Sequence, residues 1–263
     1  QLKQMSLEDL LQIKVISVSR TPMALEDAPS ALQVLNSQDI RRAGASSIPE
    51  ALRLANNLDV AQKNAHDWGI SARGFNTELA NKLLVMIDGR TVYTPLFSGV
   101  RWDVQDYLLE DIDRIEVVSG PGGSLWGANA VYGVINVTTK SAKDTQGFYG
   151  EAGGGNQLRE FAGMRYGGKL APNVSFRVYG KYFDRDSDVL ASGAAAADGS
   201  SLTHERFRLD AETPAKVSVT VQCDYYHGWE GLPGAGDAKL AGGNLLTRLS
   251  QELDNGSDVR RQL

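Results

Sequence analysis

The second half of the sequence shows only period-two patterns, and this alternation constrains the fold more than any other feature. The pattern runs through the segments 174–182, 205–212 and 217–225, where apolar side chains such as Phe176 alternate with polar ones such as Arg177. Successive residues of a β-strand point to opposite faces of a sheet. Each segment therefore predicts a strand with one apolar face and one polar, strongly charged face.

Strand length and connection length point to a particular kind of sheet. The alternating segments are about 9–11 residues long, which is the length that a tilted strand needs to cross a bilayer. Short turns at 171–173 and 213–215 alternate with polar segments at 184–201 and 230–242, which we expect to be long loops. Short turns at one rim and long loops at the other are typical of outer-membrane β-barrels.

The barrel interpretation assigns a face to each strand residue. The predicted lipid-facing set is Phe176, Val178, Phe207, Leu209, Val219 and Val221, and the predicted lumen-facing set is Arg177, Arg206, Arg208 and Gln222.

The first half of the sequence mixes helix and strand signals. A short helix is predicted from Ser37 to Gly44, and Ser47-Ile48-Pro49-Glu50 is typical of a capping box with proline in the first turn. Apolar runs bounded by turn residues at Leu83–Ile87, Ile115–Val118 and Val134–Val137 predict three strands of one sheet. These signals indicate an α+β domain.

Four ordered blocks of this first half resemble a known family. They are SQDIRRAGASSIPEALRLANNLDV (Ser37–Val60), ISARGFN (Ile70–Asn76), KLLVMIDGRTVYTPLFSGVRWDVQD (Lys82–Asp106) and IEVVSGPGGSLWGANAVYGVINVTTK (Ile115–Lys140). Together they resemble the plug domain of TonB-dependent outer-membrane receptors, in order and at the family's spacing. Two positions depart from the family pattern. Ser119 stands where arginine is usual, which puts one plug-to-barrel ion pair in doubt, and Tyr132 stands where a small or amide residue is commoner.

The resemblance implies an organisation in three parts. Residues 1–20 form an N-terminal segment with a candidate TonB box, 21–140 the α+β plug, and 141–263 an antiparallel β-meander that begins a transmembrane β-barrel. Complete plugged transporters have 22 strands. We count about six here, with a seventh beginning near Asp258, and therefore interpret the sequence as a C-terminally truncated fragment.

Composition and motifs exclude several other classes of function. The net charge of −5 argues against a nucleic-acid partner, which would favour a basic face. GPGGSLWG is not followed by Gly-Lys-Ser/Thr, so it does not indicate a phosphate-binding loop. The three histidines share no metal-ligand spacing, and no nucleophile elbow occurs. We predict no catalytic residue, no resident metal and no cofactor, and hence no enzyme.

The resemblance implies an active importer in the bacterial outer membrane. Its partners would be membrane lipid, a TonB-type energy-coupling protein, and a scarce bulky solute such as a siderophore, haem, cobalamin or another metal chelate. Two alternatives stay open, namely a passive outer-membrane pore or adhesin, and a receptor that also transduces a signal.

The resemblance also implies functional residues. The TonB box is expected at Val15, Ile16, Ser17 and Val18, a β-branched segment suited to strand addition, with an ordinary first strand of the plug as the alternative. Contacts between plug and barrel are expected at Arg73 and Glu116. The side chains expected to bind ligand are Asn64, His66, Trp68, Asn76, Thr77, Tyr93, Phe97 and Trp102, for each of which local packing of the plug is the alternative.

Overall fold

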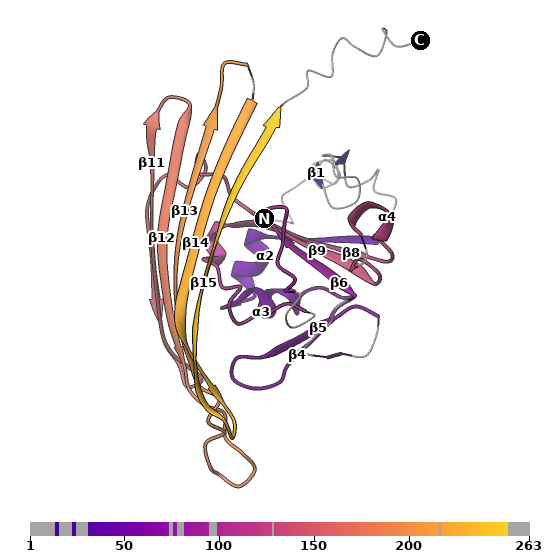
Figure 1. The fold of residues 1–263 in the computed structure, drawn as a ribbon, viewed down its shortest axis with the longest axis vertical. Helices are drawn as coiled ribbons and strands as arrows, with labels where there is room; N and C mark the ends of the chain where they lie inside the picture. The colour runs from indigo at the N-terminus through magenta and orange to yellow at the C-terminus, as the bar shows by residue number, and fades with distance from the viewer. Residues whose placement is uncertain are drawn as a thin grey trace. The chain divides into compact units, whose positions relative to one another are not determined.

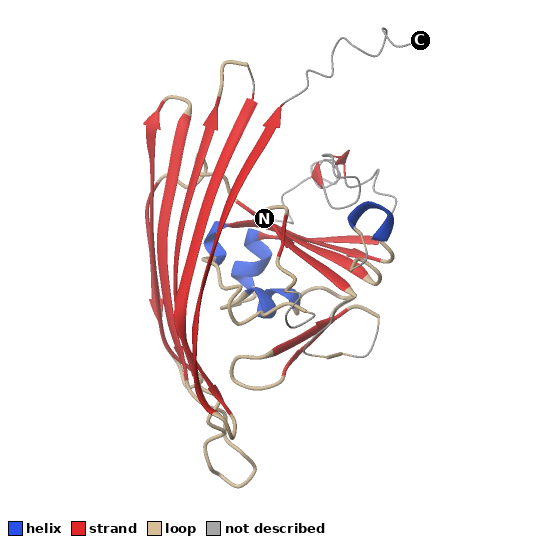
Figure 2. Ribbon diagram, in the orientation of Figure 1, coloured by secondary structure: helices blue, strands red, loops and turns tan. Residues whose placement is uncertain are grey.

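The computed structural model describes residues 14–15, 23–24, 31–73, 76–77, 82–94, 99–127, 129–215 and 217–251. The chain divides into two compact units. The first comprises Gln1–Lys140, Arg185–Ser200 and Glu230–Ala238, and the second comprises Ser141–Asp184, Ser201–Trp229 and Lys239–Leu263. Strands dominate both units, and within the described ranges no helix is long and apolar enough to span a bilayer (Figure 2).

A five-stranded sheet organises the first unit (Figure 1). Its order is β3-β8-β9-β6-β7, formed by Ala31–Asn36, Ile112–Ser119, Gly133–Thr139, Leu83–Ile87 and Arg90–Thr91 respectively. Strands β6 and β9 pair in parallel, and the other pairs are antiparallel. The three runs that the sequence assigned to one sheet therefore do share it, and that prediction is confirmed.

The two faces of this sheet carry separate cores. Along β6, Leu83, Val85 and Ile87 belong to the larger core, with side chains from helices α2 (Ser37–Arg42) and α3 (Ile48–Leu52). The intervening Leu84 and Met86 belong to a smaller core, against which Trp126 of α4 (Gly123–Trp126) packs. All five β6 residues are buried, as expected of a strand covered on both faces.

Both predicted helices form, and one capping contact differs from the prediction. Helix α2 begins after Asn36, whose side chain accepts from the backbone of Gln38 and Asp39, and it is followed by Gly44 at φ +66°. Ser47 caps α3 through its hydroxyl, which accepts from the Glu50 amide. The reciprocal half of the predicted capping box is wrong, because the Glu50 carboxylate accepts from the backbone and hydroxyl of Ser46 instead.

The described part of the first unit also contains two smaller hairpins. Strands β4 (Asp59–Gln62) and β5 (Trp68–Ser71) pair antiparallel and are joined by the loop 63–67. Strands β1 (Lys14–Val15) and β2 (Met23–Ala24) pair antiparallel near the N-terminus. Val15 is thus in a strand, whereas Ile16, Ser17 and Val18 of the predicted TonB box lie outside the described residues.

The second unit is built on a six-stranded antiparallel meander, as predicted (Figure 1). Its strands follow chain order: β10 (Gly147–Gly153), β11 (Leu158–Ala171), β12 (Val174–Arg185), β13 (Ser200–Glu212), β14 (Val217–Leu232) and β15 (Gly236–Gln251). Strands β11 to β15 have 12 to 16 residues each, longer than the sequence indicated. The expected seventh strand near Asp258 lies outside the described residues.

One predicted loop is wrong. The segment 230–242 was expected to be a long polar loop, but β14 continues to Leu232 and β15 already begins at Gly236. Gly234 (φ +78°) and Gly236 (φ +88°) adopt the left-handed conformation that a tight turn requires. The glycines that led to the loop prediction therefore form a short hairpin turn. The other long connection, between β12 and β13, is present at 186–199.

Burial along β12 follows the predicted alternation. Ser175, Arg177 and Lys181 are buried, whereas Val178 is 45% exposed and Tyr182 is also exposed. The meander also exposes large apolar side chains on other strands, namely Phe148, Met164, Leu170, Phe207, Tyr225, Trp229 and Leu245. A sheet that buries polar groups and exposes apolar ones is the inverse of a soluble one and matches the pattern expected of a barrel wall.

Candidate functional site

The loop 63–67, at the tip of the β4–β5 hairpin, is organised by Asn64. The Asn64 side-chain oxygen accepts from the amides of His66 (3.0 Å) and Asp67 (2.6 Å). Its side-chain nitrogen donates to the Asp67 carboxylate at 2.8 Å. Asparagine commonly stabilises turns in this way. Asn64 thus shapes the loop, and its half-buried side chain is already engaged there.

His66 is buried among acceptors. Its Nε2 lies 3.1 Å from the carbonyl oxygen of Gly231, and its Nδ1 lies 3.2 Å from Asp67 Oδ1 and 3.7 Å from Glu230 Oε2. Burial disfavours the charged ring, but the hydrogen bond and charge of Asp67, the Gly231 carbonyl and the Glu230 charge together raise the His66 pKa to about 9. His66 is therefore a cation at neutral pH, and an imidazolium has no free lone pair for a metal.

A second cation comes from the segment 99–106. Arg101 donates to both carboxylate oxygens of Asp103, at 3.0 and 2.6 Å, and to Glu230 Oε2 at 2.7 Å. The hydrogen bond to Asp103 contributes most to raising the Arg101 pKa above its usual value. We call His66, Asp67, Arg101, Asp103 and Glu230 the charged cluster. The cluster contains two positive groups and three carboxylates. The side chains of Asp103 and Glu230 are almost fully buried.

The loop 186–199 is tied to the same region by Asp198. One Asp198 oxygen accepts from the amide of Ala65 at 2.9 Å, and the other accepts from the amide of Asp188 at 2.8 Å. The carbonyl of Gly199 accepts from the amide of Gly231 at 2.7 Å. Three segments far apart in sequence are thereby joined within the first unit: the loop 63–67, the loop 186–199 and the tip of the β14–β15 hairpin.

The other predicted ligand residues are dispersed. Trp68 and Trp102 are buried in the larger core of the first unit. Asn76 donates to the carbonyls of Asp59 and Gly69, which secures the chain after β5. Thr77 is exposed and Tyr93 is half-buried. Phe97 lies outside the described residues.

The two residues predicted to contact the barrel have different surroundings. Arg73 is exposed and adopts a positive φ of 52°. Glu116 is fully buried on β8, where Arg114 Nε donates to its carboxylate at 2.8 Å. A hydrogen-bonded ion pair of this kind satisfies a buried charge within the plug sheet itself.

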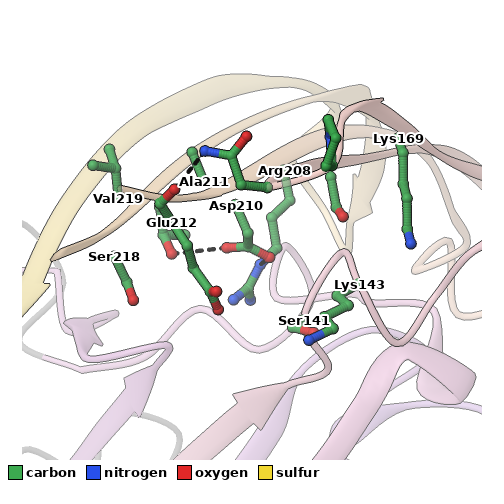
Figure 3. Close-up of a pocket in the computed structure, with 13 residues that line it drawn as sticks. Ser141, Lys143, Lys169, Arg208, Asp210, Ala211, Glu212, Ser218 and Val219 are labelled. Atoms are coloured by element: carbon green, nitrogen blue, oxygen red, sulfur yellow. Dashed lines mark hydrogen bonds and ion pairs between the residues drawn. The ribbon is translucent and has the colours of Figure 1, made fainter. Parts of the chain in front are cut away.

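The second unit carries a cleft of mixed charge where its strands are joined by short turns (Figure 3). It has a volume of about 240 Å³ and is lined by Lys143, Lys169 and Glu212 among others. Asp210 is its best-connected side chain, accepting from the Ala142 amide (2.6 Å), Arg208 Nε (2.8 Å) and the Thr220 hydroxyl (2.7 Å). Asp210 on β13 therefore binds the segment just after Lys140 through the Ala142 amide.

Sequence reasoning missed Arg101, Asp103, Asp198 and Glu230. The Arg101–Glu230 contact joins residues 129 positions apart, so no local sequence pattern could predict it. The Arg-Trp-Asp spacing at 101–103 does place two opposite charges on one side of the chain, and that was the one available signal. Among the described residues, no group of three or more histidine, cysteine or acidic side chains is placed to hold a metal ion.

Comparison with known proteins finds a family match for part of the chain. Residues 24–134 match the TonB-dependent Receptor Plug Domain. The chain is 29% identical over 150 residues to the vitamin B12 transporter BtuB of Vibrio vulnificus (strain CMCP6), covering 56% of this chain and 24% of the relative. It is 28% identical over 206 residues to the iron-regulated outer membrane virulence protein of Vibrio cholerae serotype O1, covering 72% and 30%.

The chain thus resembles the TonB-dependent receptors over their plug domain. Its fold is similar to that of the receptor FpvA of P. aeruginosa in complex with a heterologous pyoverdine and iron, with a TM-score of 0.70, 18% identity, and coverage of 92% of this chain and 34% of that one. The siderophore receptor PirA of Acinetobacter baumannii is similar with a TM-score of 0.61. The chain thus spans about a quarter to a third of the length of the receptors it matches.

Proposed function

We propose that this chain is part of an outer-membrane importer that binds a scarce, bulky solute and takes it up with energy from the TonB system. In it, residues 1–20 are the coupling segment, 21–140 the plug and 141–263 the first part of the barrel. The observation that carries the proposal is the match of residues 24–134 to the receptor plug family. The matched relatives, named as a vitamin B12 transporter and an iron-regulated outer membrane protein, support a cobalamin or a ferric chelate as the solute.

The proposed ligand contacts divide into two groups. Thr77, Tyr93 and Phe97 are proposed to meet the solute directly, and the exposure of Thr77 supports its place there. The others are proposed to support those contacts from beneath, because their side chains are already hydrogen-bonded or packed: Asn64, His66, Asn76, Trp68 and Trp102. Arg73 remains our proposed plug contact to the barrel, and its exposed guanidinium supports that role. Glu116 is proposed to act through its pair with Arg114.

Uptake in cells tests the proposal. The full-length receptor would be produced in a strain that lacks its own cobalamin and siderophore receptors, and supplied with radiolabelled cyanocobalamin, haem and a panel of ferric siderophores. We expect accumulation of one of these compounds above the background of cells without the receptor. Accumulation of none of them would contradict an importer of this substrate class.

The coupling segment can be tested separately through its backbone. If Val15–Val18 adds as a strand to a TonB-type partner, main-chain hydrogen bonds supply most of the affinity. Ile16→Pro removes one backbone donor and fixes φ, whereas Ile16→Ala keeps the strand and loses only a side-chain contact. We expect uptake near background for Ile16→Pro and partial uptake for Ile16→Ala, with cell-surface binding of the solute unchanged in both. Full uptake by the proline variant would exclude this segment as the coupling site.

A further inference from the structure

Glu230 is shared between two loops of the first unit. Its Oε2 atom lies 2.7 Å from Arg101 Nη2 and 3.7 Å from His66 Nδ1. Arg101 belongs to the segment 99–106 and His66 to the loop 63–67, while Glu230 lies at the tip of the β14–β15 hairpin. One carboxylate therefore connects three segments that are not neighbours in sequence.

Neither cation needs Glu230 for neutralisation. His66 has its own carboxylate one residue away, in Asp67, at 3.2 Å. Arg101 has its own two residues away, in Asp103, with two hydrogen bonds. Both pairs are local and would persist if the hairpin tip moved away. Glu230 is thus the third and surplus carboxylate of the cluster, and its distinctive contribution is to link the two pairs.

Burial makes this link strong. The Glu230 side chain is 7% exposed and that of His66 is 4% exposed. A carboxylate held this far from water requires charged or hydrogen-bonding partners, and its bonds to cations are about twice as strong as those between neutral groups. Two backbone contacts reinforce the same junction, since the Gly231 carbonyl lies 3.1 Å from His66 Nε2 and the Asp198 carboxylate accepts from the Ala65 amide.

We propose that Glu230 is a positioning residue that fastens the loops 63–67 and 99–106 to the tip of the β14–β15 hairpin through His66 and Arg101. Removing its charge loosens both loops while the His66–Asp67 and Arg101–Asp103 pairs stay intact. This inference rests on the proposed function in one respect, which is that the loop 63–67 carries Asn64 and His66, which we propose support the ligand contacts. Glu230 thereby holds this loop in a fixed conformation before the solute arrives.

Hydrogen–deuterium exchange of the full-length receptor tests the fastening without any ligand, so its outcome is independent of whether the receptor imports. The reporters are the amides of Ala65, His66 and Asp67. The first donates to Asp198, and the other two donate to Asn64 within the loop. In Glu230→Gln, a nearly isosteric change, we expect their exchange to accelerate on the order of tenfold, because the ion pair between Glu230 and His66 is lost. Amides of the buried strand β6 should be unaffected.

Two further variants complete the design. Arg41→Gln is the matched control, because it removes a charge that faces Glu110 at 4.0 Å on the exposed surface, away from the charged cluster. It should leave the loop 63–67 unchanged. His66→Gln should accelerate the loop by itself, and adding Glu230→Gln to it should give much less than the product of the two single effects, because both remove the same link.

The results divide clearly. Local acceleration with a non-additive double variant supports the proposal. Unchanged loop exchange in Glu230→Gln would overturn it, and so would equal acceleration in β6, which would show that Glu230 only stabilises the whole unit. Should Glu230→Gln fail to fold, His66→Gln and Arg101→Gln each cut one link. Each should then accelerate only its own loop, and acceleration of neither loop would reject the fastening.

Discussion

Raising the pH should release the loop 63–67, because His66 is held as a cation by its surroundings. The groups that face it are Asp67 and Glu230, with the Gly231 carbonyl at its Nε2. Arg101, paired with Asp103, is hydrogen-bonded to Glu230 and so affects His66 indirectly. Lys63 affects the charge of Asp67, and Asp198 accepts from the adjacent Ala65 amide. Deprotonation would leave the buried carboxylates with one fewer positive partner.

The sign and size follow from the pKa. The cluster raises the His66 pKa from 6.5 to about 9, so the stabilisation is fully present below pH 6.5 and is lost as the pH rises through about 9. One pH unit in this window corresponds to about 1.4 kcal/mol, which makes the total loss roughly 3 kcal/mol at most. A loop held by a few hydrogen bonds should become mobile over this range.

Continuous-wave EPR can follow the release. A nitroxide would be placed at the exposed position Lys63 in the full-length receptor, with the free Cys223 replaced by serine so that the label attaches once in this region. We expect an immobilised spectrum at pH 7 that converts to a mobile one with a midpoint near pH 9. The His66→Gln variant should show no such transition. A constant spectrum up to pH 10, or the same transition in His66→Gln, would refute the reasoning.

Three further predictions concern stability and orientation. In residues 21–140 expressed alone, which should be soluble and unfold cooperatively, Ile135→Ala should lower the free energy of unfolding in urea by about 2–5 kcal/mol, because Ile135 is fully buried in the central strand β9. In the same domain, Gly133→Ala should lower it by about 1–3 kcal/mol, because the added Cβ would lie 2.5 Å from the carbonyl oxygen of Val118; unchanged urea midpoints would contradict both. In the full-length receptor, a spin label at Val178 should be reached by oxygen dissolved in the bilayer and one at Arg177 should not; the reverse would shift the β12 register by one residue.

The sequence predicted the elements well where a residue's environment follows from local periodicity. The apolar runs of β6, β8 and β9 could be assigned to one sheet, and the alternation at 174–182 predicted the faces of β12. The end of β14 could not be predicted, because glycines such as Gly231 and Gly236 are locally typical of loops. In the structure the close approach of the Ala197 carbonyl requires glycine at 231, and the positive φ favours it at 236.

The candidate site was predicted less completely, for a physical reason. His66 was expected to offer a hydrogen bond to a ligand, and instead it lies buried among carboxylates as a cation. The neighbouring Asp67 supplies most of that environment, but the Gly231 carbonyl and Glu230 come from a hairpin more than 160 residues further along the chain. Trp102 likewise looks like a ligand-stacking aromatic until packing buries it in the core. Long-range contacts decide the role of each side chain, and sequence spacing does not reveal them.

The central claim, that this chain belongs to an energy-driven importer, is tested most directly by uptake with and without the proton gradient. Cells producing the full-length receptor would be given the radiolabelled compound that they accumulate, and surface binding would be measured in parallel. After a protonophore collapses the gradient, we expect accumulation to fall to the level of receptor-free cells while surface binding is unchanged. Accumulation that continues at its original rate would identify a passive pore and contradict TonB-dependent import.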